Sequence, residues 1–332
     1  MDDLRTEYIK IDSGKPEPEL IKRAAALISQ GDLVAFPTET VYGLGASAFL
    51  PAAVEKIFIA KERPEGNPLL VHISGRQQLD GLIKDVPHDA DLLMDAFWPG
   101  PLSIILPALS EVPRAVTGGQ PGVGLRMPDH PVALALIEAA GPIAAPSANR
   151  SSRPSPLTAA HVRADLDGRI AVVLDGGPSG LGLESTVIDL SRLPYRLIRS
   201  GGVSVKDLED ILHQRIIFSE NENTRLPHYQ TNSLVILCEN EEEYIDKLNY
   251  YRAQGRNTAV VNNRGIGIKT TGDVRHYDLV LDQGSSLYSI LRDAEQEGIE
   301  VLLFAPLADT DGLDAVVVDR IRRSARRSEG QK

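Results

Sequence analysis

Short apolar runs recur along this chain, and they constrain its fold more than any other feature. Residues 33–36, 69–73 and 102–106 are mostly apolar runs of four or five residues. Runs of this length between turn-forming residues are typical of buried strands. Helical segments lie between many of them, but clean strand–helix–strand repeats are few. The sequence therefore predicts an α/β fold in residues 1–213, an open twisted mixed sheet with helices packed on it.

Several of the intervening segments are predicted to be helices. Residues 20–30 place their apolar side chains on one helix face, follow Pro16 and Pro18, and stop before Gly31. Thr158 can cap another helix at its N-terminus. The expected helices are residues 20–30, 51–61, 89–97, 132–140, 158–166 and 205–212, and the expected strands are residues 33–36, 69–73, 102–106, 123–126, 142–145, 171–174, 185–190 and 195–198.

A second α/β domain is expected after the first. The 332 residues exceed what one hydrophobic core usually spans. Polar residues dominate residues 214–233, which are therefore the predicted linker. Apolar runs then alternate with helical segments, which predicts a smaller Rossmann-like parallel α/β domain in residues 234–332. Its expected strands are residues 234–237, 258–261, 277–281 and 300–304, with helices near residues 243–254 and 285–294.

The charge balance restricts the class of partner. The formal net charge is −11, and aromatic residues make up only 5% of the chain. Proteins that grip nucleic acid through its phosphates normally present a basic face, and base stacking requires aromatic side chains. Tight binding of nucleic acid by this chain alone is therefore not expected. A small ligand fits the charge balance better.

The single cysteine and the N-terminus bear on the compartment. Cys238 is the only cysteine, so no intrachain disulfide or cysteine-cluster metal site can form. It follows an apolar run and is expected to be a buried core residue. Residues 1–5 lack a basic-then-apolar signal, and no apolar run reaches the length that spans a membrane. We therefore expect a cytoplasmic protein without membrane attachment.

Residues 37–71 have the pattern of a binding site for an anion. The glycine-rich loop of residues 37–45 follows a predicted strand, and Lys61 and Arg63 lie at or just past the end of a predicted helix. Arg126 and Arg199 also lie where an apolar run meets a loop. Arginine can bind a carboxylate or phosphate in a bidentate way, whereas lysine supplies a compact charge. These residues suit a polyanionic substrate, although isolated lysine and arginine residues are more often solvated surface charges.

Three loops with small hydroxyl residues also follow or open short strands. They are residues 38–40, 147–149 and 184–186. Such loops can cradle a carboxylate or phosphate with their exposed amides, but they serve equally as helix caps or strand-end turns. On the pattern alone, the structural interpretation as caps or turns is favoured.

No sequence motif for a catalytic nucleophile is present. The chain lacks Gly-x-Ser-x-Gly, His-Glu-x-x-His and the phosphate loop Gly-x-x-x-x-Gly-Lys-Ser/Thr. The histidines lack metal-ligand spacing, and no metal-binding side chains are predicted. His72, inside an apolar run, has the setting of a core residue. An enzyme with this sequence would work by positioning its substrates and stabilising charge.

Six short sequence blocks follow one another in a fixed order, and together they resemble a known family. The spacing of charged and hydroxyl residues alone could not show this resemblance. With this order, the chain resembles the threonylcarbamoyl-AMP synthase family in its long form, a YrdC-like catalytic domain followed by a C-terminal α/β domain. The blocks cover about residues 15 to 212. They are PTETVYGL at 37–44, KERP at 61–64, FWPGPL at 97–102, RMPDHP at 126–131, APSANR at 145–150 and ESTV at 184–187.

The resemblance implies an enzyme that joins L-threonine, bicarbonate and ATP into threonylcarbamoyl-AMP and releases pyrophosphate. It implies Mg²⁺ as the cofactor that accompanies ATP. The product would be used by a tRNA threonylcarbamoyl transferase that modifies adenosine in tRNA. The enzyme would thus be a nucleotidyltransferase whose product is used in tRNA processing.

The resemblance also implies roles for particular residues. The family's Lys-x-Arg and Ser-x-Asn signature falls on Lys61, Arg63, Ser147 and Asn149, which are the expected catalytic residues. The expected threonine contacts are Thr38, His72, Arg126 and Ser185, and the expected ATP contacts are Lys61, Arg63, Thr117, Ser147, Ser155, Arg199 and Tyr229. Tyr229 belongs to the His-Tyr pair that the chain keeps from the family's linker motif.

Two alternative functions remain open on the sequence. A non-enzymatic RNA-binding or ribosome-associated module would share the catalytic domain's fold, but the net charge and the low aromatic content count against it. Carbamoyl transfer in metalloenzyme maturation would require a cysteine-rich zinc-binding segment, which this sequence lacks.

Overall fold

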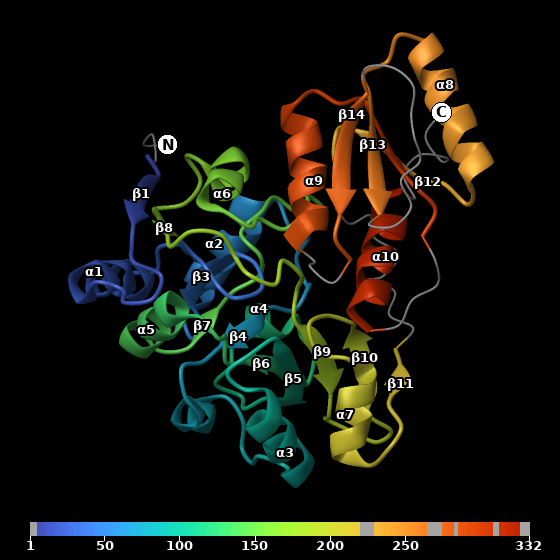
Figure 1. The fold of residues 1–332 in the computed structure, drawn as a ribbon. Coiled ribbons are helices and arrows are strands. Elements are labelled where there is room, and N and C mark those ends of the chain that lie inside the picture. Colours follow the sequence, from blue (N-terminus) through green and yellow to red (C-terminus); the bar gives the residue numbers. More distant parts are fainter. Residues whose placement is uncertain (1–4, 220–228, 264–273, 282–284, 308–311, 326–332) are drawn as a thin grey trace. The chain divides into compact units, whose positions relative to one another are not determined.

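A computed structural model describes residues 5–219, 229–263, 274–281, 285–307 and 312–325. The chain divides into two compact units (Figure 1). The first comprises Met1–Ser151 with Ser155–Glu220, and the second comprises Ser152–Pro154 with Asn221–Lys332. In the parts that the structure describes, no helix is long and apolar enough to cross a membrane.

An 11-stranded mixed sheet forms the centre of the first unit, which confirms the predicted fold class. Its strand order is β1-β8-β2-β3-β7-β4-β6-β5-β9-β10-β11. The sheet contains both parallel pairs, such as β4 with β6, and antiparallel pairs, such as β5 with β6. The strands are β1 Glu7–Lys10, β2 Val34–Phe36, β3 Gly43–Ser47, β4 Leu70–His72, β5 Leu102–Pro107, β6 Gly122–Arg126, β7 Ile143–Ala144, β8 Val172–Asp175, β9 Thr186–Asp189, β10 Arg196–Arg199 and β11 Ile217–Phe218.

Helices cover both faces of this sheet. Successive residues of a strand point to opposite faces, and in β2 Ala35 joins one apolar cluster whereas Phe36 joins another. The Phe36 cluster includes α1 and α5, and the Ala35 cluster includes α2, α3, α6 and α7. The helices are α1 Pro18–Ser29, α2 Pro51–Lys61, α3 His88–Phe97, α4 Arg114–Thr117, α5 Pro131–Ala140, α6 Ala159–Leu166 and α7 Val205–Leu212, with a 3₁₀ helix at Arg76–Gly81.

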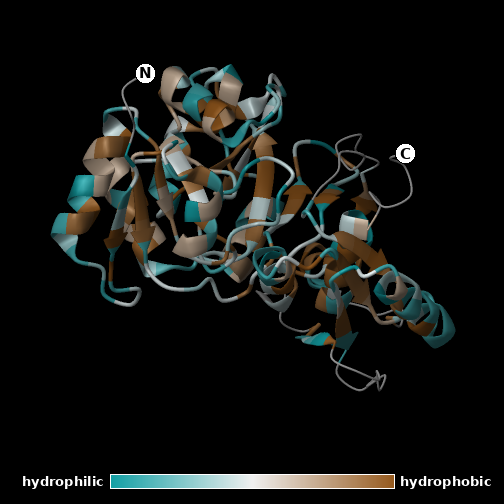
Figure 2. Cartoon of the chain, turned by 90° about the horizontal axis from the view of Figure 1, so that it is seen from above, coloured by the Kyte–Doolittle hydropathy of each residue, from teal (hydrophilic) through white to brown (hydrophobic). Residues whose placement is uncertain are grey.

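Hydropathy follows these layers. Figure 2 shows that the strands are mostly hydrophobic, whereas the helices carry hydrophilic residues as well.

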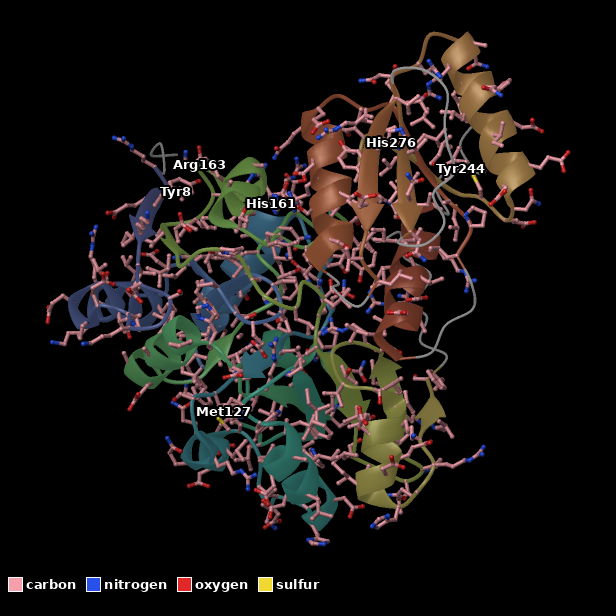
Figure 3. The ribbon with its side chains drawn as sticks, in the orientation of Figure 1. Tyr8, Met127, His161, Arg163, Tyr244 and His276 are labelled. Carbon is pink, nitrogen blue, oxygen red and sulfur yellow. The ribbon has the colours of Figure 1, made fainter. Side chains whose placement is uncertain are left out.

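Polar side chains also hold strand β1 in place. The Tyr8 hydroxyl donates to Asp167 at 2.7 Å, and the Arg163 guanidinium of α6 lies 3.8 Å from the centre of the Tyr8 ring (Figure 3). Burial and the Asp167 carboxylate raise the pKa of Tyr8 to about 12, so this hydroxyl stays protonated as a donor.

The predicted helices and strands of the first unit are present within a few residues, but the sequence pattern missed five elements: β1, β3, the 3₁₀ helix, α4 and β11. Strand β3 contains Gly43 and Gly45, for which the sequence analysis predicted a loop. A Cβ on Gly45 would lie 2.8 Å from Ile143 and 2.9 Å from Phe36. Glycine is needed there because neighbouring side chains fill the space, which hides the strand from a pattern of apolar side chains.

The second unit contains a four-stranded sheet in the order β12-β15-β13-β14. All of its pairs are parallel, as predicted. Its strands are β12 Leu234–Leu237, β13 Thr258–Asn263, β14 Arg275–Leu279 and β15 Val301–Phe304, and its helices are α8 Glu241–Ala253, α9 Ser285–Gln296 and α10 Gly312–Ala325. Cys238 is buried in its core, as expected.

One residue of helix α10 corrects the sequence interpretation. Residues 320–327 contain five arginines, a composition that predicts a solvated, basic helix end, but the side chain of Arg320 is only 1% exposed. Its guanidinium pairs with Asp319 at 2.6 Å and lies 5.6 Å from the centre of the Tyr229 ring. Tyr229 in turn stacks on Tyr288 at 5.2 Å between ring centres. The expectation was wrong because counting arginines cannot tell which one faces an aromatic core. Arg326 and Arg327 lie outside the described residues.

Candidate active site

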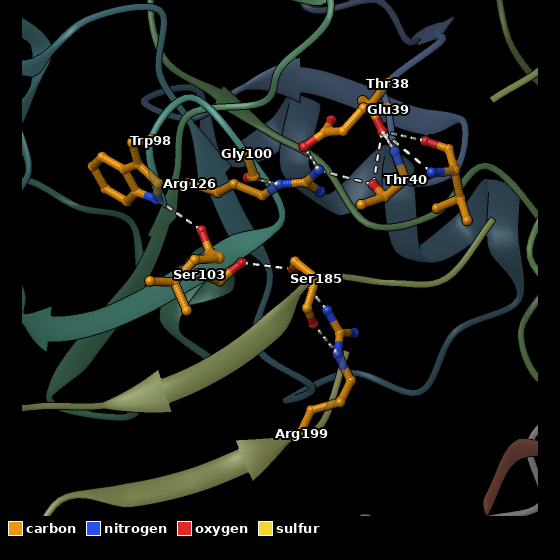
Figure 4. A network of polar contacts seen from close by, with 11 residues as sticks. Thr38, Glu39, Thr40, Trp98, Gly100, Ser103, Arg126, Ser185 and Arg199 are labelled. Carbon is orange, nitrogen blue, oxygen red and sulfur yellow. Dashed lines mark hydrogen bonds and ion pairs between the residues drawn. The ribbon is translucent and has the colours of Figure 1, made fainter. Parts of the chain in front are cut away.

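The connection between β2 and β3 begins the candidate site. Its centre is Thr38, whose hydroxyl donates to the Val41 carbonyl at 2.6 Å and lies 2.8 Å from the Thr40 hydroxyl (Figure 4). The backbone amides of Leu181 and Gly182 donate to the carbonyls of Glu39 and Thr40 at 2.7 and 3.0 Å. The loop is therefore fixed from both sides, by its own hydroxyl groups and by a segment far along the chain.

Arg126 joins this loop from the end of β6. Its side chain is buried, and its Nη2 donates to the Thr40 hydroxyl at 2.9 Å and pairs with Glu39 Oε1 at 2.6 Å (Figure 4). Its Nε donates to the Gly100 carbonyl at 3.3 Å. A planar guanidinium with five donors can satisfy several such groups at once and still face a ligand.

His72 is the register partner of Arg126 on the neighbouring strand β4. Burial, followed by the Arg126 charge, lowers the pKa of His72 to about 3. Its imidazole is consequently neutral at physiological pH. A neutral ring beside a cation can take part in binding without adding charge to the site.

The Lys-x-Arg and Ser-x-Asn blocks meet in space. Lys61, the last residue of α2, is buried, and its ammonium donates to the carbonyl of Ser147 and, at 2.5 Å, to that of Asn149. The backbone amide of Ser151 donates back to the Lys61 carbonyl at 2.7 Å. These contacts place one cation against a loop 86 residues away in the sequence.

Arg63 and Arg199 contribute two further cations. Burial, followed by the charge of Arg199, lowers the pKa of Arg63 to about 10. The Arg63 guanidinium remains charged near neutral pH, and the charge of Arg199 lies near enough to act on it. An anion placed near Arg63 would stabilise this charge.

Arg199 lies at the end of β10 and contacts the loop before β9. It donates to the carbonyl and the hydroxyl of Ser185, each at 3.0 Å (Figure 4). The Ser185 hydroxyl lies 2.7 Å from that of Ser103 on β5. A residue expected on the threonine side of the site and one expected on the ATP side are thus joined directly.

Three expected residues remain, of which Ser155 and Thr117 lie in the first unit and Tyr229 in the second. Ser155 is buried and donates to Glu184 at 2.7 Å, next to Ser185. Thr117 ends α4, and the preceding Val116 carbonyl accepts from the Leu69 amide at 2.8 Å, which places α4 beside the segment that follows Arg63. Tyr229 is described with the second unit and not with these residues.

Four residues take part in the polar contacts of the site without being among the expected site residues: Glu39, Thr40, Ser103 and Glu184. Gly201, which packs against the backbone of Ser185, was not expected either. Glu39 and Thr40 stand inside the 37–44 block, and Glu184 opens the 184–187 block. Their positions beside expected residues were a usable signal for these three. Ser103 and Gly201 carried no such signal, because only the fold brings them to Ser185.

Comparisons with family models and relatives show which family the chain belongs to. Residues 26–201 match the family model described as telomere recombination, and residues 203–326 match that of the threonylcarbamoyl-AMP synthase C-terminal domain. The threonylcarbamoyl-AMP synthase of Pyrococcus abyssi is 39% identical over 322 residues, covering 92% of this chain and 94% of the relative. This chain belongs to the threonylcarbamoyl-AMP synthase family. The resemblance noted on the six sequence blocks is thereby confirmed.

A further relative and two solved structures extend the comparison. The protein of that name from Bacillus subtilis is 40% identical, with 92% of each chain covered. The crystal structure of P. abyssi Sua5 complexed with L-threonine has a TM-score of 0.88 and 36% identity, covering 97% of this chain and 98% of that one. E. coli YciO matches with a TM-score of 0.57 and 27% identity, covering 61% of this chain and 99% of that one. Membership in this family indicates that the chain is an enzyme.

Proposed function

We propose that this chain is an L-threonylcarbamoyladenylate synthase. It joins L-threonine, bicarbonate and ATP into threonylcarbamoyl-AMP and releases pyrophosphate. The observation that carries the proposal is the contact of Lys61 with the 147–149 loop, because it assembles the family's two signature blocks into one cationic site. The P. abyssi relative crystallised with L-threonine supports the choice of amino acid.

The amino acid would bind between the β2–β3 loop and β6. Arg126 would pair with the threonine carboxylate, and the hydroxyl groups of Thr38 and Ser185 would make further contacts with the amino acid. His72, neutral because of its depressed pKa, would contact the amino acid without competing for its charges. This division leaves Lys61, Arg63 and Arg199 for the triphosphate.

The threonine ammonium first loses a proton to solvent, and the amine then attacks the carbon of bicarbonate: the N–C bond forms, the C–OH bond breaks, and the hydroxide leaves with the second amine proton as water. An oxygen of the new carboxylate then attacks the α-phosphorus of ATP. The bond from the α-phosphorus to the bridging oxygen breaks, and pyrophosphate leaves with that electron pair. Lys61, Arg63 and Arg199 would neutralise the charge that develops on the phosphates, with Thr117, Ser147, Ser155 and Asn149 completing the nucleotide's surroundings. No covalent intermediate with the enzyme is needed.

Magnesium would enter with the nucleotide. The described residues contain no group of three or more histidine, cysteine, aspartate or glutamate side chains arranged to hold a metal ion. Mg²⁺ commonly takes its ligands from substrate phosphates and water, with few from the protein. The side chains present therefore fit a Mg²⁺ ion that is held mainly by the triphosphate. When bound, this ion would neutralise further phosphate charge.

The product is a mixed anhydride that must be consumed by a transferase, and we propose a tRNA threonylcarbamoyl transferase in the cytoplasm. Tyr229 remains a proposed contact to ATP. The net charge of −11 supports a small-molecule enzyme over a stand-alone RNA-binding module.

The test is a turnover assay with a matched pair of lysine variants. The purified full chain is incubated with labelled bicarbonate, L-threonine, ATP and Mg²⁺, and pyrophosphate and the labelled adenylate are measured. Lys61→Ala should abolish both products. Lys56→Ala, on the same helix but bonded to the Gly31 carbonyl at 2.7 Å, should leave turnover unchanged. Absence of threonine-dependent products from the unaltered chain would refute the proposal, and salt-sensitive RNA binding without turnover would favour the RNA-binding alternative.

A further inference from the structure

Glu39 is an acidic side chain that pairs with Arg126, one of the cations of the site. Its side chain is 18% exposed, and Oε1 pairs with Arg126 at 2.6 Å. Oε2 is shielded from solvent and makes no hydrogen bond to any residue that the structure describes. A carboxylate can accept about four hydrogen bonds, so much of the capacity of Glu39 is unused. A shielded, unsatisfied acceptor is costly unless a ligand completes it.

The fold holds Glu39 in this place. Its carbonyl accepts from the Leu181 amide at 2.7 Å, and the next residue, Thr40, bonds to the same guanidinium nitrogen of Arg126. Figure 4 shows the carboxylate of Glu39 and the hydroxyl of Thr40 both facing Arg126. The acid and the guanidinium therefore form one fixed unit, with opposite charges side by side.

An α-amino acid carries a carboxylate and an ammonium group, which are complementary to the guanidinium of Arg126 and the carboxylate of Glu39. Its ammonium nitrogen is two bonds from its carboxylate carbon, so a carboxylate bound to Arg126 brings the ammonium close to the neighbour of Arg126. Lys61, Arg63 and Arg199 would repel that ammonium. Glu39 is the acid beside Arg126, and its Oε2 has acceptor capacity to offer.

We propose that Glu39 binds the ammonium group of the amino-acid substrate and is the residue that selects an α-amino acid over an α-hydroxy acid. This inference rests on the proposed function and deepens it, because it names the group that recognises the atom to be carboxylated. The carboxylate stays paired with Arg126 through Oε1 and accepts from the ammonium through Oε2.

Three ligands separate this role from a purely structural one. They are L-threonine, 2,3-dihydroxybutanoate, in which a hydroxyl replaces the ammonium, and L-threoninol, which keeps the ammonium but lacks the carboxylate. If Glu39 binds the ammonium, Glu39→Gln weakens threonine and threoninol but not the hydroxy acid. If Glu39 only positions Arg126, the variant weakens the two carboxylate ligands equally and leaves threoninol unchanged.

The experiment is calorimetric titration of the three ligands into the full chain and its variants. A charge-assisted hydrogen bond predicts a loss of about tenfold to a hundredfold in threonine affinity for Glu39→Gln. Glu39→Asp keeps the charge and should retain most of the preference for threonine. Glu7→Gln, which removes a carboxylate paired with Arg23 away from the site, is the control and should bind all three ligands like the unaltered chain. Melting curves confirm that each variant is folded.

Equal losses for threonine and the hydroxy acid, or unchanged threoninol binding, would overturn the inference while leaving the proposed function standing. Failure of the unaltered chain to bind or turn over threonine would instead overturn the proposed function, and this inference with it.

Discussion

Gly201→Ala is a sharp test of how the strands position Ser185. Gly201 packs directly against the backbone that carries the candidate site residues. An added Cβ would lie 2.2 Å from the Glu184 carbonyl oxygen and 2.4 Å from both the Ser185 carbonyl carbon and the Thr186 nitrogen. Real Cβ atoms essentially never approach closer than 3.0 Å, so one of the two segments must move by about 0.8 Å.

The magnitude follows from this displacement. A shift of about 0.8 Å would stretch the bonds of 3.0 Å between Arg199 and Ser185 beyond hydrogen-bonding range. Overpacking of this kind typically costs about 1–3 kcal/mol of stability. A misplacement of about 1 Å in a catalytic site can cost roughly 100-fold in rate. The variant should therefore lose kcat/KM even under conditions in which it remains folded.

The assay compares kcat/KM from pyrophosphate release with the free energy of unfolding from urea titration. Gly14→Ala is the control, because the nearest atom to its added Cβ is an Asp12 oxygen at 3.7 Å. We expect about a 100-fold loss of kcat/KM for Gly201→Ala and no loss for Gly14→Ala. Activity within about twofold of the unaltered chain, with unchanged stability, would refute the packing of residues 184–186 on Gly201.

Three further predictions concern the cations, the buried histidine and the metal. Arg199→Lys should lower kcat/KM for ATP about 10- to 100-fold, because an ammonium cannot make both bonds to Ser185; an unchanged value would argue against a positioning role for the guanidinium fork. His72 has a folded-state pKa of about 3 against about 6.5 when unfolded, so stability should fall as the pH drops below 6.5, by up to about 1.4 kcal/mol per pH unit from this residue. His72→Gln should remove that part of the slope in urea titrations across pH 4–7, and a difference independent of pH would contradict the assignment. EDTA should abolish adenylate formation and excess Mg²⁺ should restore it, whereas activity that persists without divalent cations would exclude the proposed role of magnesium.

The fold was predictable where apolar periodicity is strong. Helix α2 was expected at the residues where it occurs, because its apolar positions have helical spacing and Pro51 starts it. Strand β3 was not expected, because Gly43 and Gly45 make room for Phe36 and leave no apolar side chains of their own to count. Strand β11 has only two residues, Ile217–Phe218, and its pairing with β10 comes from the fold.

The site was predictable residue by residue but not as a set of contacts. Spacing alone left Lys61 and Arg63 open to being surface charges, and only the resemblance linked them to Ser147 and Asn149. The ion pair between Arg126 and Glu39 joins residues on different elements, and no local pattern indicates such a pair. Arg320 shows the same limit, since its burial beside Tyr229 depends on tertiary packing.

The most direct test of the central claim is the identity of the product. The full chain, given L-threonine, labelled bicarbonate, ATP and Mg²⁺, should form labelled threonylcarbamoyl-AMP with one pyrophosphate for each adenylate, and Lys61→Ala should form neither. Pyrophosphate release that does not require threonine, or no labelled adenylate from a folded chain that binds ATP, would contradict it.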